Sequence, residues 1–115
     1  MAEEEIPLSE RSCEPCRGSV PELSQQQIRE WSYQVPKWQI EDEHHLVRIF
    51  RFPDFLSALA QVNRVGELAE KFGHHPNITF TWGQVEIRIW THSSDGLTEA
   101  DFILAAKIDA LEPNS

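Results

Sequence analysis

Three histidines are the side chains of this sequence best suited to chemistry. His74 and His75 are adjacent, and His92 follows them in the same half of the chain. An imidazole has an unperturbed pKa of about 6.5, so a neutral and a protonated copy can coexist near neutral pH. Elimination of water needs one group to remove a proton and another to supply one. The histidines therefore predict acid and base catalysis if the fold brings them together.

Two other interpretations of the histidines stay open on spacing alone. Each could be a surface residue or a hydrogen-bonding group at the end of a strand. Zinc is the second alternative, because histidine is a common zinc ligand. Adjacent His74 and His75 would need a particular backbone kink to face one ion, and no established zinc motif is matched, so we expect no metal. Glu70 lies one helical turn before His74, where it can orient an imidazole.

Other candidate motifs are weaker. Cys13 and Cys16 form a single C-x-x-C near the N-terminus, without the second cysteine pair of a zinc motif. The sequence has neither a G-x-S-x-G motif nor a glycine-rich phosphate loop, so nucleophilic and nucleotide chemistry are not indicated. His44 and His45 follow an acidic turn and are interpreted most simply as solvated polar residues.

The elements that must position the histidines follow from local signals. Ser24 opens a capping-box pattern, so a first helix is expected from there to a point before Pro36. Residues 37–52 alternate apolar and polar side chains around an acidic turn and predict a hairpin. Asp54 then opens a long helix with a 3.6-residue apolar period, which Gly73 is placed to end.

A second hairpin is expected over residues 78–90, with its turn at Gly83 and Gln84. Because the returning strand of an antiparallel pair ends where the first strand began, His92 is expected to come back near His74 and His75. The three imidazoles would then meet at one edge of the sheet.

Residues 102–111 predict a final amphipathic helix. Thr98 and Asp101 have capping-box spacing in front of it, which gives Asp101 a structural explanation as a helix cap. The order is then α-β-β-α-β-β-α. It predicts an α+β fold in which three helices cover one face of a four-stranded antiparallel sheet.

Bulk properties limit the classes of function. The chain of 115 residues suits one domain, expected at 22–112, behind a flexible acidic tail at 1–21. A net charge of −9 disfavours direct nucleic-acid binding. No apolar run reaches the roughly 20 residues that span a bilayer, so a cytoplasmic protein without membrane contact is expected. Apolar side chains on both faces of residues 46–52 suggest contact with another subunit.

The histidine segment resembles a known family. The resemblance extends from about residue 23 to residue 111 and rests on the following residues: Glu70-Lys71-Phe72-Gly73-His74-His75-Pro76, Trp82, Thr91-His92, Gly96-Leu97-Thr98 and Asp101. This pattern is similar to the signature of the pterin-4a-carbinolamine dehydratases. The resemblance implies removal of water from 4a-hydroxytetrahydropterin, which yields quinonoid dihydropterin, and it implies no metal and no organic cofactor.

The same resemblance implies roles for single residues. His74 and His92 would be the acid and base pair, His75 would bind and polarise the pterin, and Glu70 would support the cluster. Three further residues would shape the pocket or hold its elements in place: Trp38, Pro76 and Asp101. A homodimer or homotetramer is implied as well.

Two points qualify the resemblance. Asp95 stands at a loop position where many members of that family carry glycine. Some proteins that resemble these dehydratases act as assembly chaperones or transcriptional coactivators, so a binding module without catalysis is the alternative function. The complete set of histidines favours the enzyme.

Overall fold

The computed structural model describes residues 22–111. The predicted tail at 1–21, including Cys13 and Cys16, lies outside the described residues. Seven elements follow one another: α1 (Gln25–Ser32), β1 (Gln39–Glu41), β2 (His45–Arg51), α2 (Phe55–Phe72), β3 (Asn77–Thr81), β4 (Gln84–Ile89) and α3 (Glu99–Asp109). The predicted order α-β-β-α-β-β-α is confirmed.

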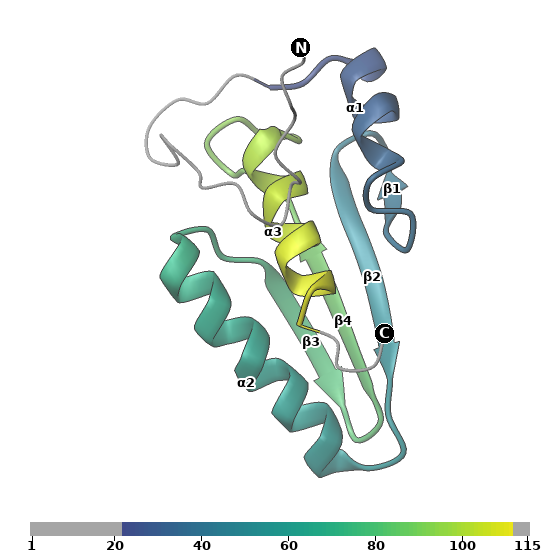
Figure 1. Ribbon diagram of the computed structural model, residues 1–115, viewed down its shortest axis with the longest axis vertical. Coiled ribbons are helices and arrows are strands. Elements are labelled where there is room, and N and C mark those ends of the chain that lie inside the picture. The colour runs from purple at the N-terminus through teal and green to yellow at the C-terminus, as the bar shows by residue number, and fades with distance from the viewer. Residues whose placement is uncertain (1–21, 112–115) are drawn as a thin grey trace.

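The four strands form one antiparallel sheet in the order β1-β2-β4-β3. Along β4 the side chains of Val85, Ile87 and Ile89 are fully buried, whereas Glu86 and Arg88 on the opposite face are partly exposed. This alternation follows from the two-residue period of a strand. Figure 1 shows α2 and α3 lying over the same face of the sheet. The predicted α+β class is confirmed.

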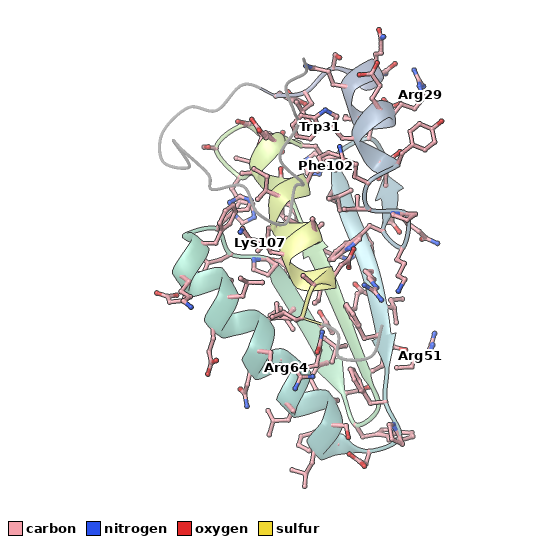
Figure 2. All side chains as sticks on the ribbon, in the orientation of Figure 1. Arg29, Trp31, Arg51, Arg64, Phe102 and Lys107 are labelled. Carbon is pink, nitrogen blue, oxygen red and sulfur yellow. The ribbon has the colours of Figure 1, made fainter. Side chains whose placement is uncertain are left out.

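A single apolar core joins the sheet to all three helices. It contains Ile28 of α1, Val65 of α2 and Phe102 of α3 together with the inward side chains of β2 and β4. Trp31 of α1 meets the ring of Phe102 edge to face, with centroids 5.7 Å apart (Figure 2). Such a geometry is favourable for aromatic pairs.

The prediction that the last helix is amphipathic is wrong. Residues 100–105 of α3 are buried without interruption. The physical reason is that α3 packs against the sheet while α1 and α2 also contact it, so little of its surface meets water. A helix enclosed in this way is apolar on most sides.

The turn of the second hairpin lies one residue earlier than predicted. Thr81 pairs with Gln84, so Trp82 and Gly83 form the turn and Gln84 belongs to β4. This register keeps Phe80 opposite Val85 on the core face, and a shift by one residue would move every side chain of a strand to the other face. Trp82 is consequently 69% exposed.

The ends of α2 are fixed by their caps. The Asp54 carboxylate accepts a hydrogen bond of 2.8 Å from the Ser57 backbone N–H at the start of the helix. At the other end Gly73 has φ 79°, a left-handed conformation that glycine adopts without steric cost. This turn directs the chain out of α2 and into His74.

The Asp54 cap makes stability depend on pH. The hydrogen bond from the Ser57 backbone lowers the pKa of Asp54, so its contribution is complete above the ordinary aspartate pKa and is lost as pH falls through the lower folded value. Asp54→Ala is expected to lower Tm by about 2 to 8 °C at pH 7. Asp54→Asn keeps an acceptor but no charge, so its deficit against the wild type should shrink below about pH 4. A deficit that stays constant from pH 7 to pH 3 in thermal melts would contradict this.

Of the helices between residues 22 and 111, none combines the length and the apolar character needed to cross a lipid bilayer.

Candidate active site

The three predicted histidines lie at one end of the β3–β4 hairpin. Asn77 pairs with Arg88, so the segment that enters β3 and the segment that leaves β4 run side by side. His74 and His75 belong to the first segment and His92 to the second. Figure 1 shows that the end of α2, the start of β3 and the first turn of α3 lie at this end of the molecule.

A histidine and a buried aspartate form the centre of the site. His74 Nε2 lies 2.6 Å from Asp101 Oδ1, and the Asp101 side chain is fully buried while that of His74 is 12% exposed. An ionised carboxylate only accepts hydrogen bonds, so Nε2 carries the proton of this contact. In the neutral imidazole the other ring nitrogen, Nδ1, then has a free lone pair. Asp101 therefore fixes the orientation and the tautomer of His74.

The second carboxylate oxygen of Asp101 is held by the start of α3. Oδ2 accepts hydrogen bonds of 2.8 Å from the Thr98 backbone N–H and from the Thr91 hydroxyl. The first turn of a helix also carries partial positive charge, which stabilises a carboxylate there. A buried charge with these partners is compensated. The predicted capping role of Asp101 is thus real, but it accounts for only one of its two oxygens.

His75 has a different partner and is exposed. Its Nε2 lies 2.9 Å from Glu70 Oε1, and the two side chains are 62% and 80% exposed. Glu70 was expected beside His74, but the left-handed turn at Gly73 directs the two histidines to different partners. An exposed pair of this kind contributes little to folding. Because most of each side chain is exposed, both are accessible to a ligand.

His92 has a third kind of partner. Its ring packs on the indole of Trp90, with centroids 4.6 Å apart. The residue between them, Thr91, donates its hydroxyl proton to Asp101. His92 is therefore connected to the His74–Asp101 pair through the backbone of one neighbouring residue.

The remaining predicted residues have different surroundings. Trp38 lies in the core just before β1, 5% exposed, and its indole N–H donates to Asp109 of α3 over 2.9 Å. It links α3 to the segment before the first hairpin, and its predicted role in shaping the pocket stays a prediction. Pro76 is half-buried between His75 and β3.

The interpretation of His44 and His45 as solvated residues is wrong. Their side chains are only 33% and 15% exposed, and each takes part in hydrogen bonds. The cause is tertiary, because the turn between β1 and β2 brings both rings against Trp90 of the strand end. Sequence patterns in the first hairpin carry no signal for these partners.

In the part of the chain that the structure describes, no group of three or more histidine, cysteine, aspartate or glutamate side chains is arranged to hold a metal ion. Independence from metal stays a prediction that experiment must test.

Fold and geometry together define a class: a small α+β protein with a histidine bonded to a buried aspartate and further histidines at the end of a hairpin. Residues 21–111 match the family model described as Pterin 4 alpha carbinolamine dehydratase. The chain belongs to this family.

Relatives agree with the assignment to this family. A protein of Rubrobacter xylanophilus named "Putative pterin-4-alpha-carbinolamine dehydratase" is 54% identical over 104 residues, which cover 90% of this chain and 97% of that protein. A protein of the same name from Alkaliphilus metalliredigens is 45% identical over 103 residues, 89% of this chain and 93% of the relative.

Two solved structures are similar in fold. The transcriptional coactivator/pterin dehydratase from Brucella melitensis superposes with a TM-score of 0.73 at 30% identity, over 78% of this chain and 97% of that chain. A pterin dehydratase-like protein described as a RuBisCO assembly factor in the alpha-carboxysome gives a TM-score of 0.55 at 25% identity, over 87% of this chain and 96% of the other.

Proposed function

We propose that this protein catalyses the dehydration of 4a-hydroxytetrahydropterin to quinonoid dihydropterin and water. The observation that carries the proposal is the buried Asp101 carboxylate bonded to His74, at the hairpin end that also bears His92. An imidazole with a fixed tautomer and a carboxylate behind it is suited to take up a proton during a reaction. Membership of the family supplies the substrate class.

The proposed reaction needs two proton transfers. Nδ1 of neutral His74 takes the proton from N5 of the pterin, and Asp101 stabilises the imidazolium that forms. The electron pair of that N–H bond forms the N5=C4a double bond as the C4a–O bond breaks. Protonated His92 gives its proton to the departing hydroxyl, which leaves as water. No redox change occurs, so the reaction balances without a metal or an organic cofactor.

The exposed pair of His75 and Glu70 fits a different task. Imidazole and carboxylate groups can hydrogen-bond the polar edge of a pterin, and their exposure leaves them accessible to a ligand. We assign His75 to binding and polarising the substrate and Glu70 to supporting His75. Trp38 and Pro76 would hold the surrounding segments in place.

We also propose that the protein is a cytoplasmic homodimer or homotetramer. Large apolar side chains are exposed on β2, in the turns after α1 and between β3 and β4, and at the start of α2: Ile49, Tyr33, Trp82, Phe55 and Leu56. Apolar surface of this kind is typical of subunit contacts. Light scattering of the purified protein should give two or four copies, and a monomer at all concentrations would contradict the proposal.

A binding module without catalysis is the second candidate. The descriptions of the two solved structures favour it: one is described as a RuBisCO assembly factor, and the Brucella melitensis protein as a transcriptional coactivator/pterin dehydratase. The two candidates differ in one measurable respect, since only the enzyme accelerates loss of the 4a-hydroxytetrahydropterin absorbance.

The test is a coupled assay in which that intermediate is generated in the presence of the purified protein. We expect dehydration faster than the spontaneous reaction, and we expect a chelator to leave the rate unchanged because protons are moved by side chains alone. Decay at the spontaneous rate would overturn the enzyme proposal. Activity lost on chelation and restored by zinc would overturn the metal-free mechanism.

A further inference from the structure

A second group of rings lies on the sheet face opposite the helices, around Trp90. The Trp90 ring centroid lies 4.6 Å from that of His92, 5.7 Å from that of His44 and 5.8 Å from that of His45. Trp90 is half-buried by these contacts. The indole thus stands between His92 of the proposed active site and two histidines of the first hairpin.

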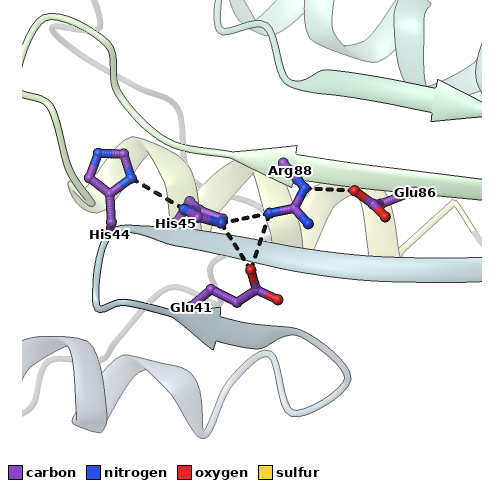
Figure 3. A network of polar contacts seen from close by, with 5 residues as sticks. All are labelled: Glu41, His44, His45, Glu86 and Arg88. Atoms are coloured by element: carbon purple, nitrogen blue, oxygen red, sulfur yellow. Dashed lines mark hydrogen bonds and ion pairs between the residues drawn. The ribbon is translucent and has the colours of Figure 1, made fainter.

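Hydrogen bonds hold the two hairpin histidines in place. Figure 3 shows His44, His45, Arg88 and two glutamates joined into one network, with the sheet and α3 behind it. His45 Nε2 lies 2.8 Å from Arg88 Nη1 and 3.3 Å from Glu41 Oε1, and the two Nδ1 atoms of His44 and His45 are 3.2 Å apart. His44 Nε2 reaches Asp95 Oδ1 at 2.9 Å.

The direction of these bonds follows from Arg88. Its guanidinium only donates, so in the 2.8 Å contact His45 Nε2 accepts and His45 carries its proton on Nδ1. Nε2 then has no proton to donate, so its 3.3 Å approach to Glu41 Oε1 is not a hydrogen bond in this tautomer. The Nδ1 proton of His45 is donated to His44 Nδ1, and His44 then donates from Nε2 to Asp95. Hydrogen bonds with Glu86 and Glu41 raise the pKa of Arg88, and the bond from Arg88 lowers the pKa of Glu41. Arg88, at one end of this chain of hydrogen bonds, therefore stays protonated and always acts as the donor to His45.

Asp95 belongs to the short loop that carries His92. The Asp95 backbone N–H donates to the His92 carbonyl at 3.2 Å, and Thr91 and Gly96 close the loop as a bridge. Asp95 has φ 54°, a conformation that costs free energy for a residue with a side chain. At this position a side chain is therefore unfavourable for the backbone, but the Asp95 carboxylate forms the hydrogen bond with His44.

We infer that Trp90 and the His44–Asp95 hydrogen bond position the imidazole of His92. Trp90 supports the ring from one side, and the hydrogen bond ties the loop of His92 to the turn between β1 and β2. Neither Trp90 nor His44 nor Asp95 need touch the substrate. The inference rests on the proposed function for its effect on rate, but the placement of His92 can be measured without any reaction.

Asp95→Gly is the central test variant. Glycine suits the left-handed backbone, so Tm should not fall, while the bond to His44 is lost. Because Asp95 is 90% exposed, the bond is a weak surface interaction, and we expect kcat to fall about two- to fivefold with KM nearly unchanged. Asp95→Asn keeps an oxygen acceptor and tolerates this backbone, so it should restore the wild-type kcat. His44→Phe keeps a ring against Trp90 but has no nitrogen for Asp95, so adding it to Asp95→Gly should cause no further loss.

Proton NMR gives the second measurement. The indole ring current shifts the ring protons of His92, which lies against it at an interplanar angle of 59°. This shift should decrease in Asp95→Gly and return in Asp95→Asn. Asp42→Gly is the matched control, because Asp42 is exposed at φ 56° in the turn between β1 and β2 and the charge change is the same. It should leave kcat and the His92 shifts unchanged.

Two substitutions of Trp90 separate the effect of an aromatic ring from that of apolar volume. Trp90→Phe keeps an aromatic surface and should lose about twofold in kcat, whereas Trp90→Leu keeps only apolar volume and should lose about tenfold. Wild-type kcat and wild-type His92 shifts in Asp95→Gly, or wild-type kcat in Trp90→Leu, would overturn the inference. If the wild type does not accelerate dehydration, the proposed function fails and the His92 shifts alone decide the placement.

Discussion

His74→Ala is expected to lower kcat by about 10²- to 10⁴-fold, the usual contribution of a positioned acid or base. The alanine variant also leaves the buried Asp101 carboxylate without its imidazole partner, so part of any loss could come from the fold. His74→Gln separates the two effects. Its side-chain amide can donate to Asp101 from near the position of Nε2, but it has no basic nitrogen. We expect it to melt close to the wild type and to be as slow as His74→Ala.

The pH profile identifies which proton transfer has been lost. The kcat of the wild type should have two limbs, one for the base and one for the acid. Variants of His74 should lack the fall in kcat at low pH, where the base becomes protonated. His92→Ala should lack the fall in kcat at high pH, where the acid loses its proton. His75→Ala should instead raise KM more than it lowers kcat, because binding the ground state and the transition state equally does not change the chemical barrier. Full activity and both limbs in the His74 and His92 variants would contradict the assigned roles.

The parts of the fold that sequence predicts well are those with local causes. Ser24, Asp54 and Gly73 act on backbone groups within a few residues, so the helix ends could be predicted from their spacing. The alternation in β4 depends only on the period of a strand. The turn at Trp82 and Gly83 was misplaced by one residue because its position is set by pairing across the hairpin, and Gly83 fits either arrangement.

The parts of the site that sequence missed have distant partners. Asp101 and His74 are 27 positions apart, and the pattern around Asp101 is fully explained by capping, so no unexplained feature pointed to the histidine. The family resemblance named Asp101 as a residue that shapes the site but not its partner. A carboxylate at the start of a strongly apolar helix was a further signal, since a buried charge requires a partner. His44 likewise meets Asp95 only through the tertiary fold, 51 positions away.

The role of Asp101 can be separated from its contribution to stability by two substitutions. Asp101→Ala removes the acceptor for His74, Thr91 and the Thr98 backbone inside the protein. Because three donors then lack a partner, it should destabilise the fold by roughly 3 to 5 kcal/mol. Asp101→Asn is nearly isosteric. Its oxygen can occupy the position of Oδ2 and keep the cap of α3, which places its NH₂ group opposite His74 Nε2. His74 Nε2 must then accept a hydrogen bond from the NH₂ group, so His74 is forced to carry its proton on Nδ1.

Asp101→Asn is therefore expected to reverse the tautomer of His74 while the fold survives. The lone pair that takes the proton in the proposed reaction is turned toward the asparagine, and no carboxylate remains to stabilise the imidazolium. A loss of about 10²- to 10⁴-fold in kcat should follow, with a Tm much closer to the wild type than that of Asp101→Ala. Nitrogen NMR of the His74 ring tests the cause directly, since the protonated atom should change from Nε2 to Nδ1. If His74 adopts the reversed tautomer and kcat nevertheless stays at the wild-type level, Nδ1 is not the base and His74 does not act in the way proposed.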